Sequence, residues 1–241
     1  MSVTICDVGP RDGLQNQPTT LAPEARAELV DRLAAAGVPR IEAVSFVSPT
    51  HVPQMAGAEE VVAAIDRRDG VVYAGLAVNE RGYDRLRESG LDEVHFAFAA
   101  TEEFSRRNAG ASVEESVLVA ERILKRATAD GIRATVTIGV AFGCPFEGAV
   151  DPGRVADLAA RLAPAGPEEI AVADTIGVGV PHQVRDLVRR LEPLGVPVGV
   201  HLHNTRNSGF ANALAALEAG VTVFDASVGG IGGCPFAPRA T

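Results

Sequence analysis

Apolar and polar positions along the chain group into two alternating kinds of segment. The first kind is short, continuous in its apolar residues and rich in β-branched side chains, which is typical of strands buried on both faces. The second kind is longer, places apolar residues at helical spacing and often closes on glycine, as helix C-termini prefer. The predicted helices include residues 24–37, 112–131 and 210–220. The predicted strands are residues 3–9, 40–47, 71–78, 93–100, 134–143, 169–177, 196–204 and 221–230.

This order of segments predicts a parallel sheet whose outer face is covered by helices. Eight strand–helix units follow one another without a linker or a break in composition, which favours a (β/α)₈ TIM barrel formed by one domain over residues 1–241. The alternative fold is an open, doubly wound sheet.

The last predicted unit lacks its helix. After the eighth strand the chain reads GIGGCPFAPRAT and stops at Thr241, so the eighth helix is missing and we expect the barrel domain to be C-terminally incomplete. Strands one and eight would then expose apolar surface. We expect either residues beyond 241 or a partner subunit to cover that flank.

Composition narrows the class of protein. With 46% hydrophobic and 22% charged residues the chain resembles an ordinary soluble enzyme, and its net charge of −9 argues against a nucleic-acid partner. No apolar run approaches the roughly 18 residues that a membrane span needs. Because the three cysteines are scattered through a long chain, we expect free thiols and a cytoplasmic location.

Polar residues gather where the predicted strands end, which is where barrels of this kind carry their active sites. Cys234 lies in the glycine-rich stretch after the last strand. We treat Gln15, Ser45 and Thr175 as candidates for substrate binding. The candidates for chemistry are Arg11, Asp12, Glu42, Asp174, His201, His203 and Cys234.

The candidate metal site rests on the spacing of two histidines. His201 and His203 are two residues apart on a strand, so both rings face the same side. With the carboxylate of Asp12 from a neighbouring strand end they form a ligand set for a divalent cation, with Mg²⁺ or Mn²⁺ favoured over Zn²⁺ or Fe²⁺. The alternative is a pair of barrel histidines that are hydrogen-bonded to neighbours without a metal.

Each remaining candidate also has a structural interpretation. Arg11 could only balance the charge of Asp12, and Glu42 could be a buried acid paired to Arg11. Asp174 could cap the turn that follows it. Cys234 is a candidate proton donor on a loop over the site, with a passive loop cysteine as the alternative. Five other residues are expected to be apolar fillers or structural and surface residues: Cys6, Cys144, His51, His95 and His182.

Several motifs together resemble the 3-hydroxy-3-methylglutaryl-coenzyme A lyase family of metal-dependent TIM barrels. They are DVGPRDGLQNQ, EAVSFVSPTHVPQMA, FGCPFEG, ADTIGVG, the H-x-H strand and GGIGGCPFAP, and they fall in order at the predicted strand ends. No dinucleotide or Walker fingerprint competes with them. The resemblance implies a retro-Claisen cleavage of an acyl-CoA substrate, 3-hydroxy-3-methylglutaryl-CoA, to acetyl-CoA and acetoacetate, and a homodimer.

The resemblance also implies roles for individual residues. Asp12, His201 and His203 would hold the cation, Arg11 would stabilise the enolate, and Cys234 would return a proton to it. Glu42 and Asp174 would orient these groups or assist proton transfer. The family's Gly-Asn, whose asparagine is a further metal ligand, would follow after Thr241.

One departure from the family pattern leaves the substrate open. The segment after H-x-H reads Asn204-Thr205-Arg206-Asn207-Ser208, where the lyases usually carry Asp-Thr-Tyr-Gly-Gln. A lyase for a related thioester such as citramalyl-CoA is therefore one alternative. A non-catalytic barrel that serves as a binding or assembly subunit is the other.

Overall fold

The computed structural model describes residues 2–233, in which eight parallel strands close into a barrel. Each strand pairs with the next along the chain, and the last pairs in parallel with the first. The predicted (β/α)₈ fold is confirmed and the open sheet is wrong. The strands are β1 (Thr4–Asp7), β2 (Arg40–Ser45), β3 (Val72–Leu76), β4 (Glu93–Ala99), β5 (Arg133–Gly139), β6 (Glu169–Asp174), β7 (Val198–Leu202) and β8 (Val223–Ala226).

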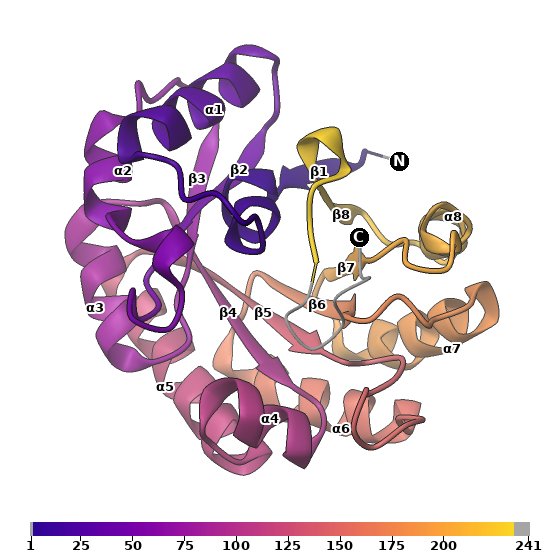
Figure 1. Ribbon diagram of the computed structural model, residues 1–241. Helices are drawn as coiled ribbons and strands as arrows, with labels where there is room; N and C mark the ends of the chain where they lie inside the picture. The colour runs from indigo at the N-terminus through magenta and orange to yellow at the C-terminus, as the bar shows by residue number, and fades with distance from the viewer. Residues whose placement is uncertain (1, 234–241) are drawn as a thin grey trace.

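Helices surround the strands on the outside of the barrel (Figure 1). α5 shows why such a segment folds. Its capping residue Ser112 accepts a hydrogen bond from the backbone N–H of Glu115, the Glu115 carboxylate accepts one from Ser112, and Gly131 ends the helix in the left-handed region. The helices are α1 (Pro23–Ala35), α2 (Ala58–Ala64), α3 (Glu80–Ser89), α4 (Glu102–Ala109), α5 (Val113–Asp130), α6 (Pro152–Leu162), α7 (Pro181–Leu191) and α8 (Gly209–Glu218).

The flank between α8 and α1 is less covered than the rest of the barrel. After β8, the described residues form only a short 3₁₀ turn, Val228–Gly230, so residues 227–233 contain no α-helix that would follow the last strand. Ile5 on β1 is 39% exposed, and Phe210 on α8 is 83% exposed. Within the described chain, no helix is both long and apolar enough to cross a membrane.

The lower part of the barrel interior is charged instead of apolar. Arg40, Glu93 and Glu169 are the first residues of β2, β4 and β6, and all three are buried. The Arg40 guanidinium contacts Glu93 and lies 2.6 Å, Nη1 to Oε2, from Glu169. Because these three strands are not neighbours in the sheet, their side chains can meet only inside the barrel. A layer that barrels usually fill with branched apolar residues is therefore an ion cluster here.

Gly199 on β7 gives this cluster its space. A Cβ atom at Gly199 would lie 1.9 Å from Oε1 of Glu169, far inside van der Waals contact. The glycine in the strand is therefore required by the carboxylate beside it, which needs the volume that a side chain would fill.

We expect Gly199→Ala to destabilise the protein by about 1–3 kcal/mol, because the added methyl group must displace a buried, ion-paired carboxylate. Urea unfolding would measure the loss. Gly139→Ala on β5 is the matched control, since its Cβ would come no closer than 3.3 Å to a neighbouring atom and should be better tolerated. Equal stability of Gly199→Ala and wild type would show that Glu169 is not confined in this way.

Candidate active site

A tight turn after β1 delivers the first two candidate residues. Residues Gly9–Gly13 form a single π-helical turn in which the backbone N–H of Asp12 donates to the Val8 carbonyl at 2.7 Å. Asp7 fixes the start of the turn by accepting a hydrogen bond from the Gly9 N–H at 2.8 Å. A Cβ at Gly13 would lie 2.6 Å from the Ile231 side chain, so glycine lets the turn pack closely. Such turns are frequent at functional sites.

The candidate metal ligands converge at the upper end of the barrel. His201 lies on β7 and His203 directly after it, and their Nε2 atoms are 3.1 Å apart. Oδ2 of Asp12 lies 3.9 Å from Nε2 of His201, and one ligand atom from each of the three residues lies within 4.8 Å of the others. Two neighbouring donors bound to one cation at about 2.1 Å stand about 3 Å apart. The two histidine nitrogens match that spacing, and the Asp12 oxygen lies somewhat farther away. The three residues are of the types that hold a divalent metal, and they lie close enough together to be its candidate ligands.

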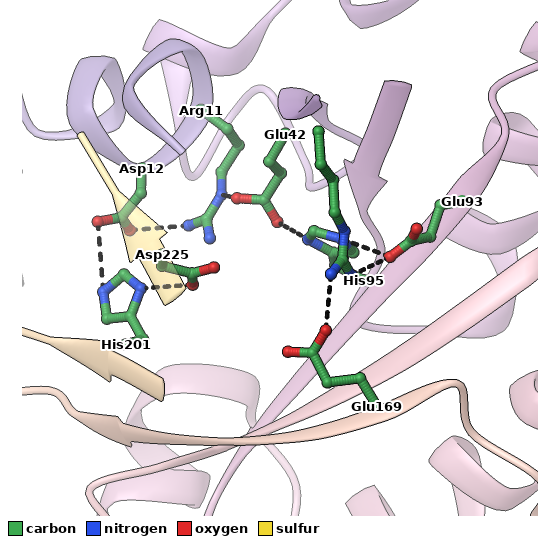
Figure 2. A network of polar contacts seen from close by, with 9 residues as sticks. Arg11, Asp12, Glu42, Glu93, His95, Glu169, His201 and Asp225 are labelled. Carbon is green, nitrogen blue, oxygen red and sulfur yellow. Dashed lines mark hydrogen bonds and ion pairs between the residues drawn. The ribbon is translucent and has the colours of Figure 1, made fainter. Parts of the chain in front are cut away.

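Asp225 on β8 orients this group, and the sequence analysis missed it. Figure 2 shows its carboxylate beside the His201 ring. The Oδ2 atom of Asp225 lies 2.9 Å from Nδ1 of His201. A carboxylate that accepts from one ring nitrogen leaves the other nitrogen free to face a ligand, which is the usual support for a metal-binding histidine. The sequence does give a signal for Asp225, because it is an acidic residue within an otherwise apolar strand. Which way its side chain points, however, depends on the register of β8 against β1 and β7.

The two imidazoles have opposite electrostatic environments. Burial acts to lower the pKa of His201, but Asp225 and Asp12 outweigh it and raise the pKa to about 9. Burial and the adjacent His201 lower the pKa of His203 to about 4. Without a cation His201 therefore keeps its extra proton at neutral pH, while His203 stays neutral. A bound cation would take the place of that proton.

Arg11 lies between two carboxylates. Its Nε donates to Oε2 of Glu42 and its Nη1 donates to Oδ1 of Asp12 at 2.8 Å. Among residues 2–233 its Nη2 has no hydrogen-bond partner, although the residue lines the central cavity. The structure thus holds the guanidinium firmly by two nitrogens and leaves the third available.

Glu42 is buried and ionised. Its burial acts to raise the pKa, but Arg11 and His95 lower it to about 2. Nδ1 of His95 lies 2.9 Å from Oε1 of Glu42, while Arg11 contacts the other oxygen. The contact with Arg11 is the pairing that the sequence predicted for Glu42. Because the carboxylate is ionised and both of its oxygens are engaged, it is poorly suited to donate a proton.

His95 extends this chain of contacts into the ion cluster below. Figure 2 shows its ring between Glu42 and Glu93. Nε2 of His95 lies 3.0 Å from Oε1 of Glu93, and Glu93 also contacts Arg40. The sequence analysis treated His95 as a structural or surface residue. It is in fact a buried part of the interior, and it also lines the central cavity.

The central cavity has a polar and an apolar side. It measures about 950 Å³, including its open mouth. Gln15 and Thr175 line it, and the Thr175 hydroxyl accepts a hydrogen bond from the Val140 N–H at 2.8 Å. The polar side is formed by Arg11, Asp12, Glu42, His201, His203 and Asp225, and the apolar side includes Leu76, Val78, Phe98 and Phe104.

Two sequence candidates, Asp174 and Ser45, do not line this cavity, and a third is not among the described residues. Asp174 caps the turn after β6 by accepting from the N–H groups of Val178 at 3.0 Å and Gly179 at 2.9 Å, as its structural interpretation predicted. Ser45 is buried, and its hydroxyl has no partner among the described residues. Cys234 lies outside the described residues.

The barrel, the candidate metal ligands, Arg11 and the cavity together define a class of protein. A closed parallel barrel carries two imidazoles and a carboxylate at the carboxyl ends of its strands, beside a fixed guanidinium and an open cavity. This is the arrangement of a TIM-barrel enzyme with a candidate metal centre.

The comparisons with known proteins give the family. Residues 2–235 match the HMGL-like family, and the chain belongs to it. It is 47% identical to the (R)-citramalyl-CoA lyase of Chloroflexus aurantiacus over 99% of this chain and 79% of that protein. It is 43% identical to the 3-hydroxy-3-isohexenylglutaryl-CoA/hydroxy-methylglutaryl-CoA lyase of Pseudomonas aeruginosa, over 99% of this chain and 80% of that protein.

Solved structures agree with this assignment. The hydroxymethylglutaryl-CoA lyase of Pseudomonas aeruginosa superimposes with a TM-score of 0.94 at 42% identity, covering 100% of this chain and 81% of that chain. An HMG-CoA lyase from Acinetobacter baumannii, in complex with coenzyme A and 3-methylmalate, gives a TM-score of 0.95 at 35% identity, covering 100% and 79%. The chain is therefore a carbon–carbon lyase of this family, as its motifs predicted.

We expect Asp225→Asn to weaken binding of Mn²⁺ about 10–100-fold, because an amide no longer holds the His201 ring as a carboxylate does. Isothermal titration calorimetry would measure the affinity. Asp7→Asn is the control, since Asp7 is also an acid at this end of the barrel but accepts from the Gly9 N–H, which an amide oxygen can still do. Unchanged affinity in Asp225→Asn would contradict the orienting role.

Proposed function

We propose that this protein cleaves 3-hydroxy-3-methylglutaryl-CoA to acetyl-CoA and acetoacetate. The observation that carries the proposal is the position of Arg11 beside the candidate metal ligands, with its Nη2 unpaired among the described residues at the wall of the cavity. Support comes from the lyases to which the chain is similar. One of their structures also contains coenzyme A.

Asp12, His201 and His203 are the residues that would hold a divalent cation, for which we favour Mg²⁺ or Mn²⁺. When bound, such a cation supplies a Lewis acid that lowers the pKa of the substrate's tertiary hydroxyl. The two neutral imidazole nitrogens and the carboxylate oxygen match the mixed nitrogen and oxygen ligands that these ions accept.

The rest of the proposed reaction concerns charge on the thioester. The hydroxyl proton passes to solvent water at the open mouth of the cavity, and C3 becomes the ketone carbon of acetoacetate as the C2–C3 bond breaks. The electrons of that bond form an enolate on the acetyl-CoA fragment. Arg11 is placed to donate from Nη2 to the enolate oxygen. Because Glu42 and Asp12 already fix the other nitrogens, little reorganisation is needed as the charge develops. Protonation at C2 then completes acetyl-CoA, and we assign that proton to Cys234.

A second substrate is favoured by one specific observation. The similar protein from Chloroflexus aurantiacus is an (R)-citramalyl-CoA lyase, at 47% identity. Citramalyl-CoA has the same tertiary hydroxyl and methyl group but one methylene fewer before its carboxylate. Asn204, where the sequence departs from the usual lyase pattern, accepts from the Gly209 N–H at 3.0 Å. It lines the cavity on the other side of the candidate metal ligands, together with Asp12, His201 and His203. The departure therefore lies at the site and is consistent with a change of thioester.

A homodimer and a cytoplasmic location remain predictions. Both come from the sequence alone, the first from the family resemblance and the second from the free thiols.

Release of acetyl-CoA from each thioester tests the function directly. We expect turnover of 3-hydroxy-3-methylglutaryl-CoA that a chelator abolishes and that added Mg²⁺ or Mn²⁺ restores. A kcat/KM at least tenfold higher for citramalyl-CoA would select the second substrate instead. Full activity in the metal-depleted enzyme would contradict the role of the three ligands.

We expect Arg11→Lys to lower kcat about 100-fold or more, because a single ammonium cannot hold both carboxylates and also reach the enolate oxygen. Steady-state kinetics would measure this. Arg26→Lys is the control, since Arg26 is buried even more deeply than Arg11 but donates to the Ala56 carbonyl, away from the cavity. Wild-type kcat in Arg11→Lys would remove the charge-stabilising role.

A further inference from the structure

His95 lies between two carboxylates. Its Nδ1 is 2.9 Å from Oε1 of Glu42 and its Nε2 is 3.0 Å from Oε1 of Glu93, with the residue only 8% exposed. A neutral imidazole has one N–H donor, whereas an imidazolium has two. Two ionised carboxylates in hydrogen-bonding range of both ring nitrogens therefore favour the charged ring.

The charges around His95 lead to the same conclusion. Three buried carboxylates, Glu42, Glu93 and Glu169, and the adjoining Asp12 face three guanidinium groups, those of Arg11, Arg40 and Arg133, the last 3.6 Å, Nε to Oε2, from Glu93. A fourth cation balances the cluster. The other ionisable groups around it come from β1 and β8 and are Cys6 and Asp225, and Nη2 of Arg40 lies 3.1 Å from Nε2 of His95.

We propose that His95 is a positioning residue for the lyase reaction. Its charged ring donates a hydrogen bond to one oxygen of Glu42, so that Glu42 contacts only one nitrogen of Arg11. The role is indirect, because His95 acts on the reaction only through Glu42 and Arg11. The inference rests on the proposed function for its kinetic readout.

The geometry gives a reason why one oxygen of Glu42 must stay bound to His95. Carboxylates and guanidinium groups readily form paired, two-point contacts. If Oε1 of Glu42 lost its partner, the carboxylate would be free to turn toward Arg11 and engage a second nitrogen. That contact would occupy or displace Nη2, the nitrogen that the proposed reaction needs. His95 prevents this by keeping Oε1 engaged on the far side.

The electrostatics support a charged ring over the working pH range. Burial acts to lower the pKa of His95, but the hydrogen bonds and charges of Glu42 and Glu93 raise it to about 9. Because the folded-state pKa lies above the ordinary value of 6.5, the ring keeps its proton at neutral pH and loses it as the pH rises through about 9.

The test compares two variants of the same buried network in the metal-loaded enzyme. His95→Gln removes the charge and one of the two donors. Glu169→Gln breaks an ion pair at the other end of the network, where the residue contacts Arg40 and not Glu42. We expect His95→Gln to lower kcat about 10–100-fold with KM for the thioester changed less than about threefold. We expect Glu169→Gln to lose stability while its kcat stays within about threefold of wild type.

The outcomes separate this proposal from the proposed function. Absence of thioester cleavage by the wild-type enzyme would overturn the lyase assignment itself. With an active wild type, an unchanged kcat in His95→Gln would overturn the positioning role. So would equal losses of kcat in both variants, because a general loosening of the barrel would then explain them.

A measurement on the wild-type protein decides the matter if His95→Gln fails to fold. The chain has five histidines, few enough to resolve by ¹⁵N NMR of labelled side chains. We expect the His95 ring to show two protonated nitrogens at pH 7 and to titrate near pH 9. A neutral His95 ring at pH 7 would overturn the proposal, whatever the enzyme cleaves.

Discussion

The guanidinium of Arg11 is the group on which the rest of the site depends. It must keep a positive charge at a fixed position beside the candidate metal ligands, and it must keep one nitrogen free. Glu42 and Asp12 meet the first requirement by engaging two other nitrogens. A buried charge is stable only when its partners are themselves hydrogen-bonded. The need to satisfy Glu42 therefore extends the polar network downward through His95 into the barrel.

The barrel fold makes such a continuous network possible. Side chains from strands that are not neighbours in the sheet meet along the barrel axis, and the register places β2, β4 and β6 at matching heights. Arg40 and Glu42 on β2 face Glu93 and His95 on β4 at two successive levels. The ion cluster at the bottom of the barrel and the candidate active site at its top are consequently linked by one continuous set of ionic contacts.

Much of this could be predicted from the sequence, because it depends on local patterns. Apolar runs separated by helical segments predicted the barrel, and the H-x-H spacing predicted that His201 and His203 face the same side. Asp12 was placed correctly because the ends of parallel strands share one edge. The interaction partners of the buried ions could not be derived in the same way. Which carboxylate meets His95 or His201 depends on strand register and barrel closure, and these are set by the whole sheet.

The ion cluster at the base of the barrel also bears on how this sequence can change over time. An apolar layer tolerates stepwise exchange of one aliphatic residue for another. In contrast, removal of Arg40 alone would leave Glu93 and Glu169 short of a counter-charge, and breaking a buried pair costs about 3–5 kcal/mol, a large share of a typical protein's stability. Substitutions at these positions should therefore persist mainly as compensated sets. We therefore expect Arg40, Glu93 and Glu169 to be substituted together rather than one at a time.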